Sequence, residues 1–164
     1  MQGNVPCGAP FNFMSLFSGA GIGDYGFQLA GGVCLAACEI DPNRRAVHKR
    51  NVDSPVWGDI RKDADSLIDF CRKSVVDLLV ATPPCQGFST ANAKRGKRDC
   101  HSSSRLDQRN NLFFEALNVA NALKPKVILF ENVPNFLEKS VIEPVAGNIG
   151  KIREFISAGV SDVL

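Results

Sequence analysis

No hydrophobic run in this sequence approaches the roughly 20 apolar residues that a membrane-spanning helix requires. The first residues, MQGNVPCGAPFNF, lack the basic start and the apolar stretch of a secretory signal. A disordered composition is missing as well, because 45% of the 164 residues are hydrophobic and only 22% are charged. These absences disfavour membrane, secreted and fibrous proteins, and they leave a globular chain whose length fits one domain.

The sequence also lacks the paired cysteine motifs of metal sites. None of its six cysteines forms a C-x-x-C pair, and no histidine follows at zinc-finger spacing, so we expect no metal site. In a reducing compartment the thiols stay free, and Cys34, Cys38 and Cys71 lie in apolar patterns typical of small buried hydrophobes. Cys85 differs, because it follows two prolines and precedes Gln-Gly in a segment typical of neither helix nor strand.

A strong excess of one charge is missing too, since a formal net charge of +2 does not by itself indicate a nucleic-acid binder. The distribution is uneven, however: residues 94–105 carry five basic side chains and one acid, a local charge of +4 that leaves −2 for the rest. Such a segment is typical either of a loop that contacts phosphates or of a solvated surface loop. Its basic residues are Lys94, Arg95, Lys97, Arg98 and Arg105.

Short apolar runs alternate with helical patterns along the chain, which predicts a mostly parallel sheet of about five strands flanked by helices. Asp41 and Pro42 are typical of a helix N-cap and of the first helical position. We expect residues 1–10 to form an N-terminal extension and residues 11–164 to form the domain. The predicted strands span 11–17, 33–38, 56–57, 75–81 and 127–130, and the predicted helices span 24–30, 42–51, 61–73, 110–123 and 141–157.

Residues suited to chemistry follow each predicted strand directly. Because ligands of open parallel sheets bind outside the carboxyl ends of the strands, these residues predict a single site at one sheet edge. After the fourth strand, the polar stretch 82–107 has the length of a functional loop. The segments at the edge are a glycine-rich turn at 18–23, Glu39, Asp59, the run Pro83-Pro84-Cys85-Gln86, and Glu131-Asn132-Val133.

The glycine-rich turn F-S-G-A-G-I-G lets the backbone approach a ligand at a helix N-terminus, although a tight structural turn is the alternative explanation. Glu39, at the end of the next strand, is placed to hold ribose hydroxyls. Asp59 is either a surface-turn acid or, with Ile60, a contact for an adenine ring. Together these residues indicate a nucleoside-containing cofactor, and they leave open whether it is a nicotinamide cofactor or S-adenosylmethionine.

Cys85 and Glu131 are the residues best suited to catalysis. A reactive cysteine needs an exposed, electropositive setting, and Cys85 follows a rigid Pro-Pro pair and precedes the basic segment. A buried, inert cysteine is the alternative. Glu131 ends an apolar strand, so its carboxylate faces either the solvent or a pocket in which it can act as an acid near neutrality.

In order and spacing of motifs, the chain resembles the cytosine C5 DNA methyltransferase family from about residue 13 to residue 137. The resemblance implies a Rossmann-like S-adenosylmethionine-dependent methyltransferase fold, incomplete at its C-terminal side. It also implies an intracellular protein, cytoplasmic in a prokaryote and nuclear in a eukaryote, with restriction-modification as one setting. The motifs are F-S-G-A-G at 17–21, Glu39, G-D-I at 58–60, P-P-C-Q-G-F-S at 83–89, R-N-N-L-F at 109–113 and E-N-V at 131–133.

The resemblance further implies that Cys85 adds to C6 of a cytosine flipped out of DNA, while Glu131 contacts N3 and the exocyclic amine. C5 then takes the methyl group of S-adenosylmethionine, and loss of the C5 proton with elimination of Cys85 restores the ring. The implied cofactor residues are Phe17, Ser18, Gly19, Ala20, Gly21, Glu39, Ile40, Asp59, Ile60, Pro84 and Leu112. The implied DNA contacts are Pro83, Gln86, Ser89, Asn132, Val133, Lys94, Arg95, Lys97, Arg98 and Arg109, and residues 89–106 correspond to a mobile loop that closes over DNA.

The chain departs from the family pattern in two places. Many members have Asp where this chain has Ser15, and a Q-x-R-x-R segment, a target-recognition region and a final cofactor motif are absent after Leu137. We therefore expect the N-terminal catalytic part of an enzyme, as a fragment or as one subunit of a split enzyme with a second polypeptide. The fifth strand should then present an uncovered edge, and the chain alone should be poorly soluble or seek a partner.

Three alternatives stay open from the sequence. An RNA cytosine methyltransferase would share these motifs, and the recognition region that would decide is absent. A non-catalytic Rossmann-like module would bind a cofactor, or nothing, without chemistry, although Cys85 and Glu131 argue against it. A nicotinamide dehydrogenase fits poorly, because nothing supplies its proton-transfer group beside the glycine turn.

Overall fold

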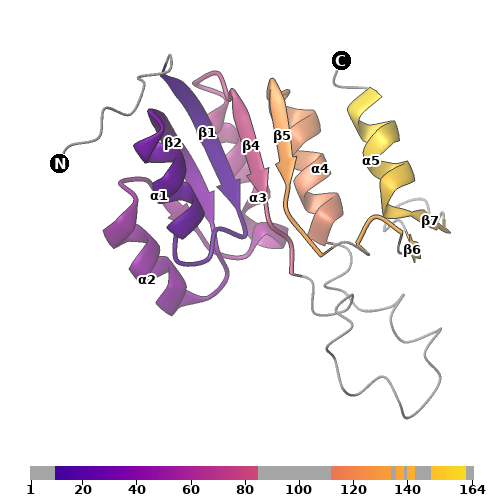
Figure 1. Ribbon diagram of the computed structural model, residues 1–164, viewed down its shortest axis with the longest axis horizontal. Coiled ribbons are helices and arrows are strands. Elements are labelled where there is room, and N and C mark those ends of the chain that lie inside the picture. The colour runs from indigo at the N-terminus through magenta and orange to yellow at the C-terminus, as the bar shows by residue number, and fades with distance from the viewer. Residues whose placement is uncertain (1–9, 85–111, 134–135, 139, 143–148, 162–164) are drawn as a thin grey trace, which may run out of the picture.

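The computed structural model describes residues 10–84, 112–133, 136–138, 140–142 and 149–161, and its centre is a parallel sheet of five strands (Figure 1). The strand order β3-β2-β1-β4-β5 confirms the predicted α/β class. The strands are β1 (Phe11–Leu16), β2 (Gly32–Cys38), β3 (Val56–Trp57), β4 (Leu78–Ala81) and β5 (Val127–Phe130). The helices between them are α1 (Ile22–Leu29), α2 (Pro42–Asn51), α3 (Ile60–Cys71) and α4 (Leu112–Leu123).

Helices cover both faces of the sheet. Figure 1 shows α1 and α2 in front of the β1–β2 half, and α3 and α4 behind the sheet. Right-handed crossovers produce this arrangement, because the chain runs outward from β1 to β3 and then returns to β4 and β5 on the other side. None of the described helices is long and apolar enough to cross a membrane.

Local sequence signals explain where α2 and α3 begin. Asp41 caps α2, since its carboxylate accepts hydrogen bonds from the backbone N–H groups of Asn43 and Arg44 at 2.8 and 3.2 Å, and Pro42 occupies the first turn. This matches the predicted start of the helix. Asp59 caps α3 in the same way through the N–H of Arg61 at 3.2 Å. Both caps satisfy backbone donors that a helix N-terminus otherwise leaves unpaired.

The largest core cluster lies between the sheet and the two rear helices. It joins Met14 and Leu16 of β1 to the buried face of α3, which presents Leu67 and Cys71 as the helical pattern predicts. A second cluster, around Phe13 and Cys34, packs beneath the front helices. β1 is thus buried on both faces, as expected of a central strand in a parallel sheet.

β5 is the outermost strand on one side of the described sheet. Its residues Val127 and Leu129 are 56% and 42% exposed, and they alternate with partly buried neighbours. The predicted uncovered edge at the fifth strand is therefore confirmed for the part of the chain that the structure describes. β4 is shorter than predicted and begins at Leu78, directly after Asp77, whose side chain accepts from the N–H of Asn12 at 2.8 Å.

The prediction of a single helix over residues 141–157 is wrong. The structure instead has two short antiparallel strands, β6 (Ser140–Ile142) and β7 (Ile149–Lys151), followed by α5 (Ile152–Ser161). Pro144, Gly147 and Gly150 disfavour a continuous helix here, because proline and glycine cost the most in a helix interior. Glu154 accepts from the N–H of Lys151 at 2.9 Å, so the start of α5 carries its own local signal.

Candidate active site

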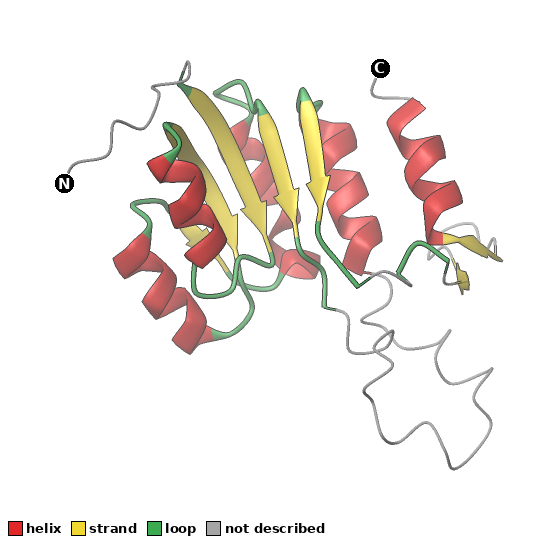
Figure 2. Ribbon diagram, viewed as in Figure 1, coloured by secondary structure: helices red, strands yellow, loops and turns green. Residues whose placement is uncertain are grey.

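The loops that follow the five parallel strands meet at one edge of the main sheet, toward which the arrowheads of those strands point (Figure 2). Backbone hydrogen bonds fix the first residue of each loop to the neighbouring strand. Ser18 donates to the carbonyl of Cys38 at 3.0 Å, Glu39 to that of Trp57 at 3.0 Å, and Glu131 to that of Ala81 at 3.1 Å. The predicted convergence of these segments is confirmed for their described residues.

The glycine turn after β1 has a compact left-handed backbone. Phe17, Gly19 and Gly21 have φ angles of 62°, 57° and 78°, and the Gly21 N–H donates to the Ser18 carbonyl at 3.0 Å. A Cβ atom added at Gly19 would meet no atom of the described residues within 4 Å, whereas one at Gly21 would lie 2.7 Å from Cδ2 of His48. Gly19 therefore faces open space, and Gly21 faces the protein.

The side chain of Glu39 binds the backbone of this turn. One carboxylate oxygen accepts from the N–H of Gly19 at 2.9 Å, and the other accepts from the N–H of Asp41 at 2.8 Å. Glu39 is 6% exposed, so these charge-assisted hydrogen bonds are sheltered from water. The residue thus joins the glycine turn to the start of α2. The sequence-based prediction that Glu39 holds ribose hydroxyls did not include these contacts with the backbone.

Two features of the turn fit a bound nucleoside-containing cofactor. The hydroxyl oxygen of Ser18 is buried and has no hydrogen-bond partner among the described residues, which is unusual for a buried polar atom. The open space at Gly19 lets another molecule approach the backbone closely. Ala20 completes the turn, and its carbonyl accepts from the side-chain amide of Asn51 at 2.8 Å.

The predicted adenine contacts differ in their surroundings. Ile40 is 61% exposed and free to pack against a ring, whereas Ile60 is 3% exposed and belongs to the main core cluster. Asp59 forms an ion pair with Arg61 at 2.8 Å, and the hydrogen bond from Arg61 lowers the pKa of its carboxyl group. The structure thus engages Asp59 as a helix cap and ion-pair partner.

The segments after β4 and β5 are tied together. The side-chain amide of Asn132 donates to the carbonyl of Pro83 at 2.7 Å, and its oxygen accepts from the N–H of Val133 at 2.9 Å. Pro83 is buried and Pro84 is partly buried. Both ends of the Asn132 side chain thus bind the protein backbone in this structure, and its predicted contact with substrate stays a prediction.

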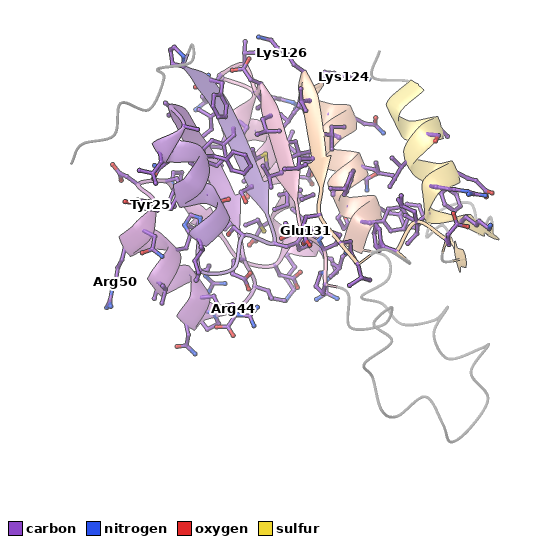
Figure 3. The ribbon with its side chains drawn as sticks, viewed as in Figure 1. Tyr25, Arg44, Arg50, Lys124, Lys126 and Glu131 are labelled. Atoms are coloured by element: carbon purple, nitrogen blue, oxygen red, sulfur yellow. The ribbon has the colours of Figure 1, made fainter. Side chains whose placement is uncertain are left out.

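Glu131 and Leu112 lie at the same edge. Figure 3 places Glu131 at the carboxyl end of β5, and its side chain is exposed among the described residues. Leu112, at the start of α4, is partly buried and packs with Phe17 against the main core cluster. Thr82 connects the segment after β4 to the segment after β1, since its hydroxyl donates to the carbonyl of Phe17 at 3.0 Å.

The remaining predicted site residues lie outside the described residues. These are the predicted nucleophile and most of the predicted DNA contacts, so their placement stays a prediction. They are Cys85, Gln86, Ser89, Lys94, Arg95, Lys97, Arg98 and Arg109.

The other cysteines behave as predicted where they are described. Cys34, Cys38 and Cys71 are free and buried, and burial raises the pKa of their thiols to about 12, 12 and 11. Such thiols are inert, because the thiolate is the nucleophile. No group of three potential metal-ligating side chains occurs within the described part of the chain.

Sequence reasoning missed one buried polar pair beside the turn. Nε2 of His48 lies 2.8 Å from Oδ2 of Asp24, and the two side chains are 0% and 4% exposed. Asp24 belongs to the first turn of α1, and His48 lies near the end of α2. The only signal in the sequence is a histidine at a buried position of an otherwise polar helix, which does not reveal its partner.

The parallel sheet, the glycine turn and the acidic residue after β2 together are typical of α/β domains that bind nucleoside-containing cofactors. Within that class, the chain belongs to the family of C-5 cytosine-specific DNA methylases, whose model matches residues 11–151. It is 35% identical over 133 residues to the type II methyltransferase M.AluI of Cellulosimicrobium cellulans, covering 79% of this chain and 24% of that protein. It is 36% identical over 129 residues to M1.HgaI of Avibacterium volantium, covering 76% and 35%.

Solved structures show the same fold. A crystal structure of a candidate DNA modification methyltransferase encoded in an E. coli prophage matches with a TM-score of 0.60 and 24% identity, covering 92% of this chain and 38% of that one. A DNMT2 variant from Spodoptera frugiperda matches with a TM-score of 0.55 and 19% identity, covering 93% and 41%. The chain spans 24% to 43% of the length of the curated relatives compared with it.

Proposed function

We propose that this protein carries the catalytic half of an enzyme that methylates C5 of cytosine in DNA. Membership of the cytosine methylase family supports the reaction class. The observation that carries the proposal is the hydrogen bond from Asn132 to the Pro83 carbonyl. It links the residue next to Glu131 to the segment that leads directly into Cys85, so the predicted acid and nucleophile belong to connected loops.

The glycine turn and its neighbours are the proposed cofactor site, as the unpartnered Ser18 hydroxyl and the open space at Gly19 indicate. When bound there, S-adenosylmethionine supplies an electrophilic methyl group. The backbone of the turn would approach the cofactor closely, and the exposed Ile40 would pack against its adenine ring. The proposed set comprises Phe17, Ser18, Gly19, Ala20, Gly21, Glu39, Ile40, Asp59, Ile60, Pro84 and Leu112.

In the proposed reaction, the thiolate of Cys85 forms a bond to C6 of the cytosine ring. Electron density moves to C5 and toward N3, where the carboxyl group of Glu131, in its protonated form, donates a hydrogen bond that stabilises the developing charge. C5 then forms a bond to the methyl carbon, whose bond to the sulfonium sulfur would break and leave S-adenosylhomocysteine. A base removes the C5 proton. The electron pair of that C–H bond re-forms the C5–C6 double bond and expels the Cys85 thiolate, so the enzyme returns unchanged.

The target cytosine must leave the duplex to reach these groups, because its ring carbons are stacked between neighbouring bases. The positive charge of residues 94–105 suits contact with DNA phosphates. Because the chain spans less than half of the relatives it matches, we propose that complete activity also requires the sequence that corresponds to the rest of them. That sequence would lie on the same or on a second polypeptide.

Mechanism-based trapping tests the reaction. The chain, alone and with a polypeptide that supplies the later family motifs, is incubated with S-adenosylmethionine and duplex DNA containing 5-fluorocytosine. Fluorine at C5 cannot leave as a proton does, so the adduct persists and the protein shifts in a denaturing gel. In the combined sample, we expect a gel shift of the chain with Cys85 present and none with Cys85→Ser.

Two outcomes would contradict the proposal. The absence of an adduct in the combined sample would favour a non-catalytic binding module. An adduct that survives Cys85→Ser would place the nucleophile elsewhere. A parallel methyl-transfer assay with tRNA distinguishes an RNA substrate from a DNA substrate.

A further inference from the structure

Helix α2 contacts the glycine turn through two of its side chains, Asn51 and His48. The side-chain amide of Asn51, the last residue of α2, donates to the carbonyl of Ala20 at 2.8 Å. α1 and α2 lie side by side on the same face of the sheet (Figure 1), so the turn that precedes α1 reaches the end of α2. A side chain from one helix therefore fixes a backbone group of the other helix's entry turn.

The imidazole of His48 forms a second support. It lies so close to Gly21 that a Cβ atom there would be 2.7 Å from Cδ2 and 3.1 Å from Cγ of the ring. The ring is itself fixed, because Nε2 donates to the carboxylate of Asp24 at 2.8 Å and no part of His48 is exposed. The turn is thus held between α2 and the first turn of α1.

These supports replace a local cap that α1 lacks. Gly21 is its N-cap and offers no side-chain hydrogen bond, and its φ of 78° lies in the left-handed region. Neither Asn51 nor His48 belongs to the segments that line the carboxyl edge of the sheet. They contact Ala20 and Gly21, respectively, whereas a Cβ atom added at Gly19 would meet no atom of the described residues within 4 Å.

We propose that Asn51 and His48 are positioning residues for the cofactor, which set the affinity of the glycine turn without touching the ligand. This inference rests on the proposed function, since it assumes that the turn binds the cofactor. Asn51 is the sharper of the two to test, because it is exposed and its loss leaves no buried group unpaired. His48 is fully buried, and replacing it also disturbs the fold.

The experiment compares three variants of the 164-residue chain. Asn51→Ala removes the hydrogen bond, and Asn51→Asp keeps the size but places an acceptor against the Ala20 carbonyl. Asn43→Ala is the matched control, because the Asn43 side chain on the same helix makes no hydrogen bond within the described part of the chain. The readouts are the Kd for S-adenosylhomocysteine by calorimetry, hydrogen exchange of the amides at 18–22, and the melting temperature.

We expect Asn51→Ala to raise the Kd about three- to tenfold, as loss of one net hydrogen bond does, and to speed exchange in the turn. Asn51→Asp should weaken binding at least as much, and Asn43→Ala should match the unsubstituted chain. A melting temperature close to that of Asn43→Ala would separate positioning from a general loss of stability.

Three results would overturn the inference, and they differ in what else they refute. Unchanged affinity in both Asn51 variants refutes the positioning role alone. Failure of the unsubstituted chain to bind S-adenosylhomocysteine refutes the cofactor assignment and the positioning role together. A Kd that rises only in proportion to a fall in melting temperature shared with Asn43→Ala would also count against positioning.

Discussion

The two left-handed glycines of the turn should respond very differently to the same substitution. Gly19 and Gly21 have φ angles of 57° and 78°, so alanine at either position meets a backbone strain of about 1–2 kcal/mol. At Gly21 the new methyl group also lies 2.7 Å from the His48 ring, which is buried and fixed by Asp24. Because this ring cannot move aside, overpacking should add about 1–3 kcal/mol.

We therefore expect Gly21→Ala to lower the free energy of unfolding by about 2–5 kcal/mol and Gly19→Ala by about 1–2 kcal/mol. Urea denaturation of the 164-residue chain measures both. Gly23→Ala is the third member of the series, because Gly23 lies in α1 with no atom within 4 Å of an added Cβ. That variant should be neutral or more stable by up to about 1 kcal/mol, since alanine favours a helix over glycine.

Gly19→Ala should be the less destabilising of the two turn variants, but it should weaken cofactor binding more than Gly21→Ala does. A methyl group at Gly19 points into the open space that we assign to the cofactor, so Gly19→Ala should weaken S-adenosylhomocysteine binding out of proportion to its stability loss. Equal destabilisation by Gly19→Ala and Gly21→Ala would refute the close packing of His48 against the turn. Undiminished binding by Gly19→Ala would refute the cofactor position.

Three further results follow from named contacts. Glu39→Gln should destabilise the chain by about 1.5–3 kcal/mol, because one of the two partly buried N–H groups that Glu39 binds then faces an amide donor. Denaturation measures the loss, and a neutral effect would contradict the stabilising role of these two hydrogen bonds. Asn132→Asp keeps the acceptor for Val133 but loses the donor to Pro83, so adduct formation with fluorocytosine DNA should slow about tenfold at an unchanged melting temperature. Arg61 lowers the pKa of Asp59 in the folded state. The stabilising contribution of Asp59 is therefore present above its unfolded pKa near 4 and is lost as the pH falls through its folded pKa. Asp59→Asn should flatten this part of the curve of unfolding free energy against pH.

The order and type of the elements in the main sheet were predictable because their signals are local. Asp41-Pro42 marks the start of α2, and the continuous apolar run around β4 marks a strand buried on both faces. The prediction of one helix in the C-terminal segment was wrong for a reason that is also local. Apolar spacing over 141–157 suggested one helix, although Pro144 and Gly150 in the same stretch disfavour it.

The site was predictable at the level of backbone placement but not of side-chain partners. Parallel strands bring their carboxyl ends together whatever follows them, so Glu39 and Glu131 could be assigned to one edge. The partner of each side chain depends on packing between elements distant in sequence. Asp24 and His48 are 24 residues apart, and Asn132 and Pro83 are 49 apart. No periodicity in the sequence reports such pairs.

The two halves of the site differ in how firmly the protein holds them. The glycine turn follows β1, a central strand, and Glu39 and α2 both bind it from within the fold. Glu131 follows β5 at the free edge of the described sheet, where its side chain is exposed. A hydrogen bond from a carboxyl group gains less in water than in a sheltered site, because the local dielectric is high in water. The proposed cofactor half is therefore preorganised by this chain, whereas the proposed stabilisation of charge on cytosine by Glu131 requires that something further, whether DNA or additional protein, exclude water from the end of β5.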